Sequence, residues 1–98
     1  MYVSIRRSKT QPYAADEIVR HASEGLLPQL KAISGFVSYD ILMLDDETLM
    51  TISVFETKTA AEESNQLVVT WARGFDLASL IQGSPELAVG EIVLHHSK

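Results

Sequence analysis

The feature that most constrains the fold is a strand pattern that leads directly into a long amphipathic helix. Residues 49–55, LMTISVF, are mostly hydrophobic or β-branched and contain no Gly or Pro, which predicts a strand. Thr59 predicts the start of a helix, because Glu62 three residues later completes a capping box. At about 100° per residue, one arc of this helix collects Ala60, Ser64, Leu67, Val68, Trp71, Ala72 and Phe75. The helix therefore packs on another layer, with Trp71 as its largest anchor.

The rest of the chain supplies three more strands and one more helix. Residues 2–7 predict a strand with Val3 and Ile5 on one face and Ser4 and Arg6 on the other. Residues 14–33 predict a helix that Gly25 and Pro28 kink or divide near Leu26–Leu27. Residues 36–44 predict a strand that pairs with 49–55 in a hairpin through the polar turn 45–48. A helical turn at 77–82 and a final strand from 86 to about 95 complete the chain.

This order, strand-helix-strand-strand-helix-strand, is typical of α+β folds of the ferredoxin-like class. We expect one domain over residues 1–98, with a four-stranded antiparallel sheet and both helices on one face. The strands are apolar on both faces, since in residues 49–55 Met50, Ile52 and Val54 oppose Leu49 and Phe55. Helices can cover only one of these faces. The pattern therefore predicts a homodimer through the open sheet face.

The charge and residue usage exclude several classes of partner. The 13 acidic and 8 basic residues give a net charge of −5, which argues against nucleic acid or an anionic membrane as the main partner. The absence of cysteine excludes disulfides, thiolate nucleophiles and Cys-ligated metals. No apolar run approaches a membrane span and no signal-peptide pattern is present, so a soluble cytoplasmic protein is expected.

Several motifs, taken in order, resemble the antibiotic biosynthesis monooxygenase-like superfamily. They are residues 34–39 (SGFVSY), residues 51–56 (TISVFE), the helix with Ala61, Ser64 and Trp71, and residues 89–93 (VGEIV). The resemblance implies a dimeric α/β barrel of ferredoxin-like protomers. It leaves the reaction open, because the superfamily includes cofactor-independent oxygenases of polyketide quinols, haem-degrading enzymes, and muconolactone-isomerase-like and chlorite-dismutase-like relatives.

The residues favour some of these activities over others. Haem-degrading members use an Asn on the first strand and a haem-ligating His, whereas this chain offers Ser4 or Arg6 there and no His in its second helix. The quinol-oxidising members that the chain resembles need no metal or flavin, so no cofactor is expected. They bind an electron-rich phenol in an apolar, water-poor cavity with a few groups that stabilise the phenolate.

Six residues are candidates for such a substrate site. Trp71, Phe75, Phe55 and Tyr39 could wall a cavity between sheet and helices, with Asn65 and Ser53 as polar contacts. Each also has an ordinary structural interpretation, because a Trp at the centre of a helix face is typical of a core and Asn65 is typical of a helix surface. No residue stands out as a catalytic acid or base.

Metal and nucleotide sites find little support. His95 and His96 are adjacent in a predicted strand and point to opposite faces, so they cannot chelate one metal from a regular strand. There is no phosphate-binding glycine loop and no dinucleotide fingerprint. Three hypotheses remain: a cofactor-independent oxygenase acting on an aromatic or quinol-like molecule, a non-catalytic module that binds a small apolar or aromatic ligand, and a structural homodimer.

Overall fold

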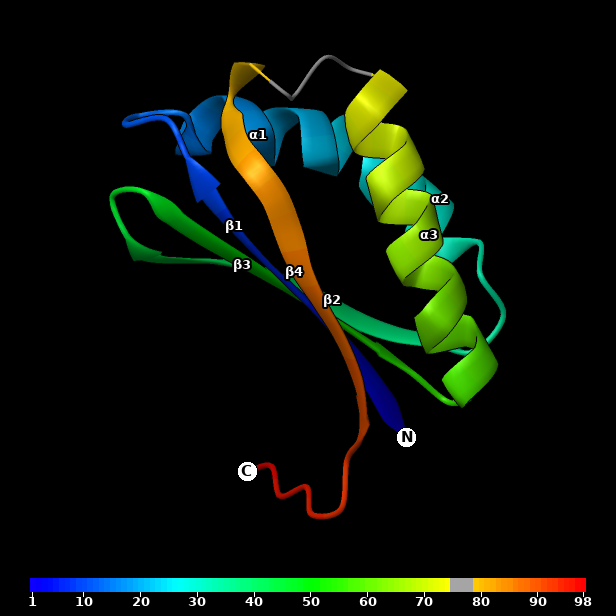
Figure 1. Ribbon diagram of the computed structural model, residues 1–98. Helices are drawn as coiled ribbons and strands as arrows, with labels where there is room; N and C mark the ends of the chain where they lie inside the picture. The colour runs from blue at the N-terminus through cyan, green and yellow to red at the C-terminus, as the bar shows by residue number, and fades with distance from the viewer. Residues whose placement is uncertain (75–78) are drawn as a thin grey trace.

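The structure, a computed structural model, describes residues 1–74 and 79–98. Its strands are β1 (Tyr2–Thr10), β2 (Phe36–Asp45), β3 (Thr48–Phe55) and β4 (Ile81–Glu91). Its helices are α1 (Ala15–His21), the π-helical turn η1 (Ala22–Leu26), α2 (Leu27–Lys31) and α3 (Lys58–Gly74). The sheet is antiparallel in the order β2-β3-β1-β4, and the helices lie on one side of it (Figure 1). The α+β, ferredoxin-like prediction is confirmed.

The first helical segment is divided where the sequence predicts. α1 passes through η1 into α2 between Leu26 and Leu27, and Pro28 occupies the first turn of α2. Proline has no N–H to donate to the carbonyl four residues earlier, and its ring collides with that carbonyl. A wider π-helical turn just before Pro28 is consistent with this constraint, and such turns are frequent at functional sites.

Two local predictions are corrected at the ends of elements. α3 begins at Lys58, and the hydroxyl of Thr57, not of Thr59, accepts a hydrogen bond from the Ala60 N–H at 3.2 Å. β4 begins at Ile81, so the part of the predicted helical turn at 81–82 is strand, while residues 77 and 78 lie outside the described part of the chain. In the pairing of β1 with β4, Arg7 lies opposite Glu86 and Lys9 opposite Gln82, so the register shifts between them. The shift accommodates residues 83–85, where Gly83 has a φ of +74°. Gly-Ser-Pro therefore forms an irregularity within one strand.

The core lies between the sheet and the helices. Its buried hydrophobic residues are Ala22, Leu26, Leu30, Phe55, Ala60, Ala61 and Trp71. A register shift near the start of β2 turns Phe36 toward this core, where its ring meets that of Phe55 edge-on with centroids 5.8 Å apart. The sequence pattern placed Phe36 on the opposite face from Tyr39, and the bulge corrects that prediction because it adds one residue to the strand's alternation.

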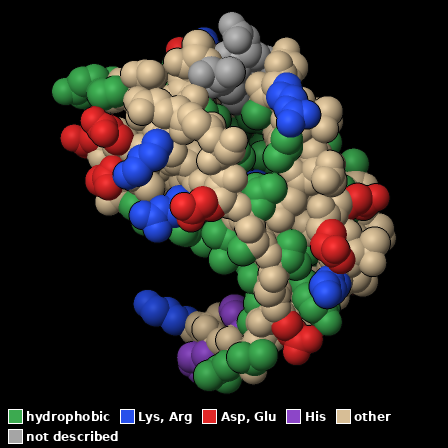
Figure 2. All heavy atoms as spheres, in the orientation of Figure 1, with side chains coloured by type: hydrophobic (Ala, Val, Ile, Leu, Met, Phe, Trp, Pro, Cys, Tyr) green, Lys and Arg blue, Asp and Glu red, His purple; other side chains and the backbone are tan. Residues whose placement is uncertain are grey.

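The other side of the sheet is not covered by helices. Strand pairs on this side include Val3 with Val54 and Ile5 with Ile52, and all four side chains are half-buried. β4 ends at Glu91, where the prediction had it continue to about His95; only the Ile92 N–H extends its pairing, to the Met1 carbonyl at 2.9 Å. Val93 and Leu94 are exposed. Figure 2 shows hydrophobic side chains between β4 and α3 and along the uncovered side of the sheet.

Candidate functional site

The side of β1 that faces the helices is polar. Ser4 and Arg6 are buried beneath α3, with exposed fractions of 0% and 3%, while Val3 and Ile5 face the uncovered side. Because strand side chains alternate between faces, the position of Arg6 in the register directs its long side chain into the interior. A buried arginine in the layer between sheet and helix is the most unusual feature of the molecule.

The Arg6 guanidinium is held by neutral acceptors from two strands and one helix. Its Nε donates to Thr51 Oγ1 at 2.8 Å and its Nη2 donates to Ser53 Oγ, both on β3. Its Nη1 donates to Asn65 Oδ1 of α3 at 3.0 Å and to Ser4 Oγ at 3.2 Å. These contacts fix the plane of the guanidinium.

Ser64 completes this group, which we call the Arg6 cluster (Arg6, Ser4, Thr51, Ser53, Ser64 and Asn65). Ser64 Oγ donates to the Ala61 carbonyl at 2.7 Å and lies 2.7 Å from Ser4 Oγ. A hydroxyl carries one proton, so Ser4 is the donor to Ser64 while it accepts from Arg6. The hydroxyl dipoles therefore run away from the cation and stabilise it.

The cluster contains no negative charge. Among residues 1–74 and 79–98, no Asp or Glu side chain forms an ion pair with Arg6. Burial lowers the pKa of Arg6 to about 10, so the guanidinium is still protonated at neutral pH. The pKa of Tyr39 is raised by burial, an effect that the nearby Arg6 charge and Thr51 oppose, so its phenol is neutral at this pH.

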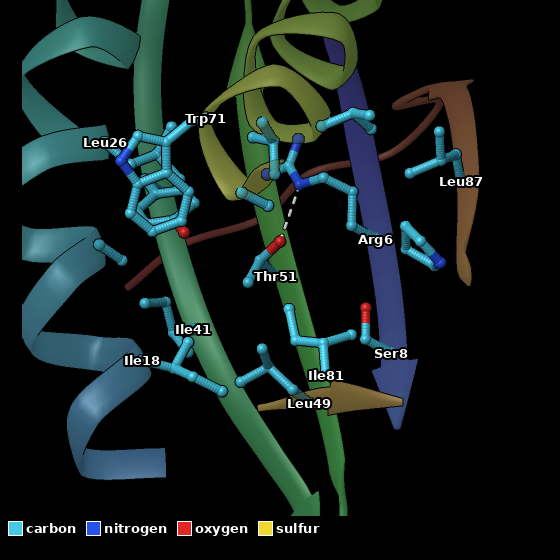
Figure 3. Close-up of a pocket in the computed structure, with 16 residues that line it drawn as sticks. Arg6, Ser8, Ile18, Leu26, Ile41, Leu49, Thr51, Trp71, Ile81 and Leu87 are labelled. Atoms are coloured by element: carbon cyan, nitrogen blue, oxygen red, sulfur yellow. Dashed lines mark hydrogen bonds between the residues drawn. The ribbon is translucent and has the colours of Figure 1, made fainter. Parts of the chain in front are cut away.

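A cavity of about 60 Å³ adjoins the cluster. Arg6, Thr51, Tyr39 and Trp71 line it, and Figure 3 shows Arg6 extending from β1 toward Thr51, with Trp71 on the side opposite Arg6. The rest of the wall is mainly aliphatic and includes Ile18, Ala22, Leu26, Ile41, Leu49, Val68 and Ile81. The site therefore combines an apolar body with one positively charged end.

A larger surface hollow of about 350 Å³ lies next to this cavity. Val69, Ala72, Ile81 and Pro85 line both spaces and form the boundary between α3 and β4. The cavity alone is smaller than the roughly 150 Å³ that holds benzene in an engineered protein core. An aromatic ligand thus requires this boundary to open, so that cavity and hollow join.

The structure brings together four of the six predicted site residues. Trp71 and Tyr39 line the cavity, while Ser53 and Asn65 belong to the Arg6 cluster at its polar end. Phe55 is wholly buried in the core and does not line the cavity. Phe75 lies outside the described residues.

Sequence reasoning missed Arg6 and Thr51 as site residues. The signal was present, because Ser4 and Arg6 alternate with Val3 and Ile5, and Thr51 and Ser53 alternate with Met50, Ile52 and Val54. Two polar strand faces that pair with each other indicate a shared polar patch.

The described residues offer few side chains that could bind a metal ion. In residues 1–74 and 79–98, no group of three or more His, Asp or Glu side chains is arranged to hold a metal ion. His95 and His96 lie exposed after the end of β4. Within the same residues, no helix is both long enough and apolar enough to cross a membrane.

The fold has many counterparts among solved structures. A protein of unknown function from Nitrosomonas europaea aligns with a TM-score of 0.76 at 15% identity, over 99% of this chain and 93% of its own. A candidate antibiotic biosynthesis monooxygenase from the same organism aligns with a TM-score of 0.71 at 17% identity, over 96% and 100%. A monooxygenase from the gene ActVA-Orf6 of Streptomyces coelicolor, in complex with the ligand nanaomycin D, gives 0.71 at 14% identity, over 96% and 92%. No family model and no curated protein matches the sequence. The similarity therefore establishes the fold.

Proposed function

We propose that this chain, which has the fold of the antibiotic biosynthesis monooxygenase-like superfamily, is a cofactor-independent monooxygenase of a small aromatic or quinol-like molecule. The observation that supports this most is the apolar cavity that runs from Trp71 to the buried Arg6 cluster. An electron-rich ring fits the aliphatic wall, and its oxygen fits the polar end.

The chemistry requires only the substrate and oxygen. With 1,4-dihydroxynaphthalene as a model substrate, O₂ gives 2-hydroxy-1,4-naphthoquinone and water. One oxygen atom forms the new C–O bond at a ring carbon, and the other leaves as water with two hydrogens from the substrate. The substrate supplies all four electrons. The protein contributes a site poor in water and hydrogen-bond donors that stabilise the phenolate from which oxygen accepts electrons.

The first prediction is oxygen uptake with this quinol. We expect the protein to accelerate uptake above the buffer rate and to place one atom of isotopically labelled O₂ in the product. Ala72→Leu should abolish the acceleration, because Ala72 lines the boundary through which the ligand enters. Thr70→Leu, an exposed change on the same helix, should leave the acceleration unchanged. Added catalase should return no oxygen, since the second atom ends as water.

Other outcomes would select the two remaining hypotheses. A change in emission of Trp71, the single tryptophan, upon quinol addition without labelled product would indicate a non-catalytic binding module. Tyr39, which lines the cavity, is a neutral phenol and therefore a poor general base, and this is consistent with a module that binds without catalysis. No response in either assay would leave a structural homodimer.

We also propose that two chains associate through the uncovered side of the sheet. The central pairs Val3–Val54 and Ile5–Ile52 present four apolar side chains there. Toward the edge of this side, Leu42, which pairs with Met50, is 38% exposed. Contiguous apolar surface of this kind is typical of an interface, and an antiparallel sheet with helices on one face leaves its second face to a partner.

Sedimentation velocity tests this association. We expect the wild-type protein to be a dimer at micromolar concentration and Ile52→Lys to be a monomer, because a lysine at the centre of the interface would leave a charge unpaired. Thr70→Lys adds the same charge on the exposed side of α3 and should remain dimeric. A wild-type monomer across the concentration range would refute the dimer.

A further inference from the structure

We infer that Arg6 is the counter-ion of the ligand, which binds as a flat, apolar monoanion with its phenolate or enolate oxygen at the guanidinium. This inference names the ligand class of the proposed function and rests on that function for the location of the site. It stands on the geometry of the Arg6 cluster and on its position beside the cavity.

The charge of Arg6 is buried without a negatively charged partner among the described residues. Charged side chains are rarely buried without an opposite charge, because removing a charge from water is costly. Arg6 is 3% exposed and its five hydrogen-bonded contacts are all neutral oxygens. The described part of the chain thus builds a cation and solvates it with dipoles, but leaves its charge unbalanced. An anion beside it would supply the missing charge.

The hydrogen bonds of Arg6 are distributed unevenly over its two terminal nitrogens. A guanidinium has five N–H groups, two of them on Nη2. Among residues 1–74 and 79–98, Nη1 serves three acceptors, Asn65, Ser4 and Ser64, whereas Nη2 has a single contact, with Ser53. One Nη2 N–H therefore has capacity for a further acceptor. The cluster fixes the guanidinium plane before the ligand arrives, so this donor is already oriented.

The lining of the cavity fits a ligand with one negative charge on an apolar body. Arg6 is the only cationic side chain among the described residues that line the cavity, and the wall opposite it consists of Trp71 and aliphatic residues. Arg73 lines the adjoining hollow, but its side chain is exposed, where water screens its charge. The net charge of −5 opposes the approach of polyanions such as nucleotides. Tyr39, the other ionisable residue of the wall, is neutral and does not compete for the cation. A phenolate satisfies all of these conditions.

The probe is 4-nitrophenol, whose anion absorbs visible light while its neutral form does not. In a titration near the pKa of the free phenol, we expect the protein to increase the visible absorbance, because the bound anion is stabilised by Arg6. 4-Nitroanisole, the neutral methyl ether of the same size class, should bind at least about tenfold more weakly, since charge-assisted hydrogen bonds contribute free energies equivalent to about 10–100-fold in Kd. Quenching of Trp71 emission gives the Kd of both ligands.

Three variants assign the effect to Arg6. Arg6→Gln keeps a donor but removes the charge, and should weaken 4-nitrophenolate binding about 10–100-fold with no change for 4-nitroanisole. Arg6→Lys keeps the charge but loses the planar fork of N–H donors. Its affinity for 4-nitrophenolate should lie between those of the wild type and Arg6→Gln. Arg20→Gln removes the same charge from the exposed side of α1, away from both the cavity and the proposed interface, and should bind like the wild type. Circular dichroism checks that each variant is folded.

Each outcome separates this inference from the proposed oxygenase. Anion-selective binding without oxygen uptake would sustain the role of Arg6 and refute the oxygenase. Equal affinity of the wild type for 4-nitrophenolate and 4-nitroanisole would overturn the inference, even if quinol oxygenation were observed. This comparison uses only the wild-type protein, so it does not depend on whether any variant folds. Tighter binding of 4-nitrobenzoate than of 4-nitrophenolate would overturn the phenolate assignment in favour of a carboxylate.

Discussion

Replacing Phe55 by alanine is expected to lower the free energy of unfolding by about 3–5 kcal/mol, as truncation of buried aromatic residues does. The side chain has no exposed surface and packs edge-on against Phe36. Its removal would forfeit both the burial of the ring and the contact between the two rings, and the surrounding β-strands cannot close the space without breaking their pairing. Urea unfolding, followed by circular dichroism, measures this loss.

Two controls make the Phe55 prediction specific. Phe55→Leu retains an apolar side chain and should lose much less stability than Phe55→Ala. Val93→Ala removes an apolar side chain that is 88% exposed, and should change the free energy of unfolding by less than about 0.5 kcal/mol. Because Phe55 does not line the cavity, the folded fraction of Phe55→Ala should bind 4-nitrophenolate like the wild type. A loss below about 1 kcal/mol for Phe55→Ala would contradict its place in the core.

Trp71→Ala is expected to affect stability and binding together. Trp71 is 7% exposed and belongs to the core cluster, yet it also lines the cavity. An indole that faces a void has fewer packing partners on that side. The loss should therefore lie near the lower end of the range for large aromatic truncations, about 3 kcal/mol. Affinity for 4-nitrophenolate should fall as well, because the apolar wall opposite Arg6 is removed.

Absorbance of the bound nitrophenolate and urea unfolding measure these two effects without the tryptophan signal. Trp71→Phe keeps an aromatic wall and should preserve most of the affinity and stability. A stability loss well below 1 kcal/mol with complete loss of binding would show that Trp71 is only a pocket wall. Full loss of stability with unchanged binding would show that it is only a core residue.

Local sequence patterns were sufficient for the order of elements and for the main anchor of the core. The apolar arc of the second helix predicted that Trp71 and Ser64 are buried, and both are. Gly25 and Pro28 predicted the division of the first helical segment, which the structure shows between Leu26 and Leu27. These features depend on periodicity and on backbone stereochemistry, which act over a few neighbouring residues.

Strand ends and bulges were less predictable. The last strand was predicted from residue 86 but begins at Ile81, and Phe36 was placed on the wrong face. In both cases extra residues, one in β2 and two in β4, are accommodated within the pairing with a neighbouring strand. The cost of such a bulge is set by the partner's hydrogen bonds, which the local sequence does not contain.

The candidate site could be predicted only in part from local sequence patterns. Residue periodicity is enough to place Ser4 and Arg6 on one face of a strand, and Trp71 and Asn65 on one helix. Burial of the polar face of β1 depends on contacts between distant elements, because Thr51, Ser53, Ser64 and Asn65 converge on Arg6 from β3 and α3. A single strand pattern favours burying Val3 and Ile5 beneath the helices. The free-energy cost of burying a cation is offset only when hydrogen-bond acceptors that are distant in sequence surround it. The local sequence does not show this arrangement, because it forms only in the assembled fold.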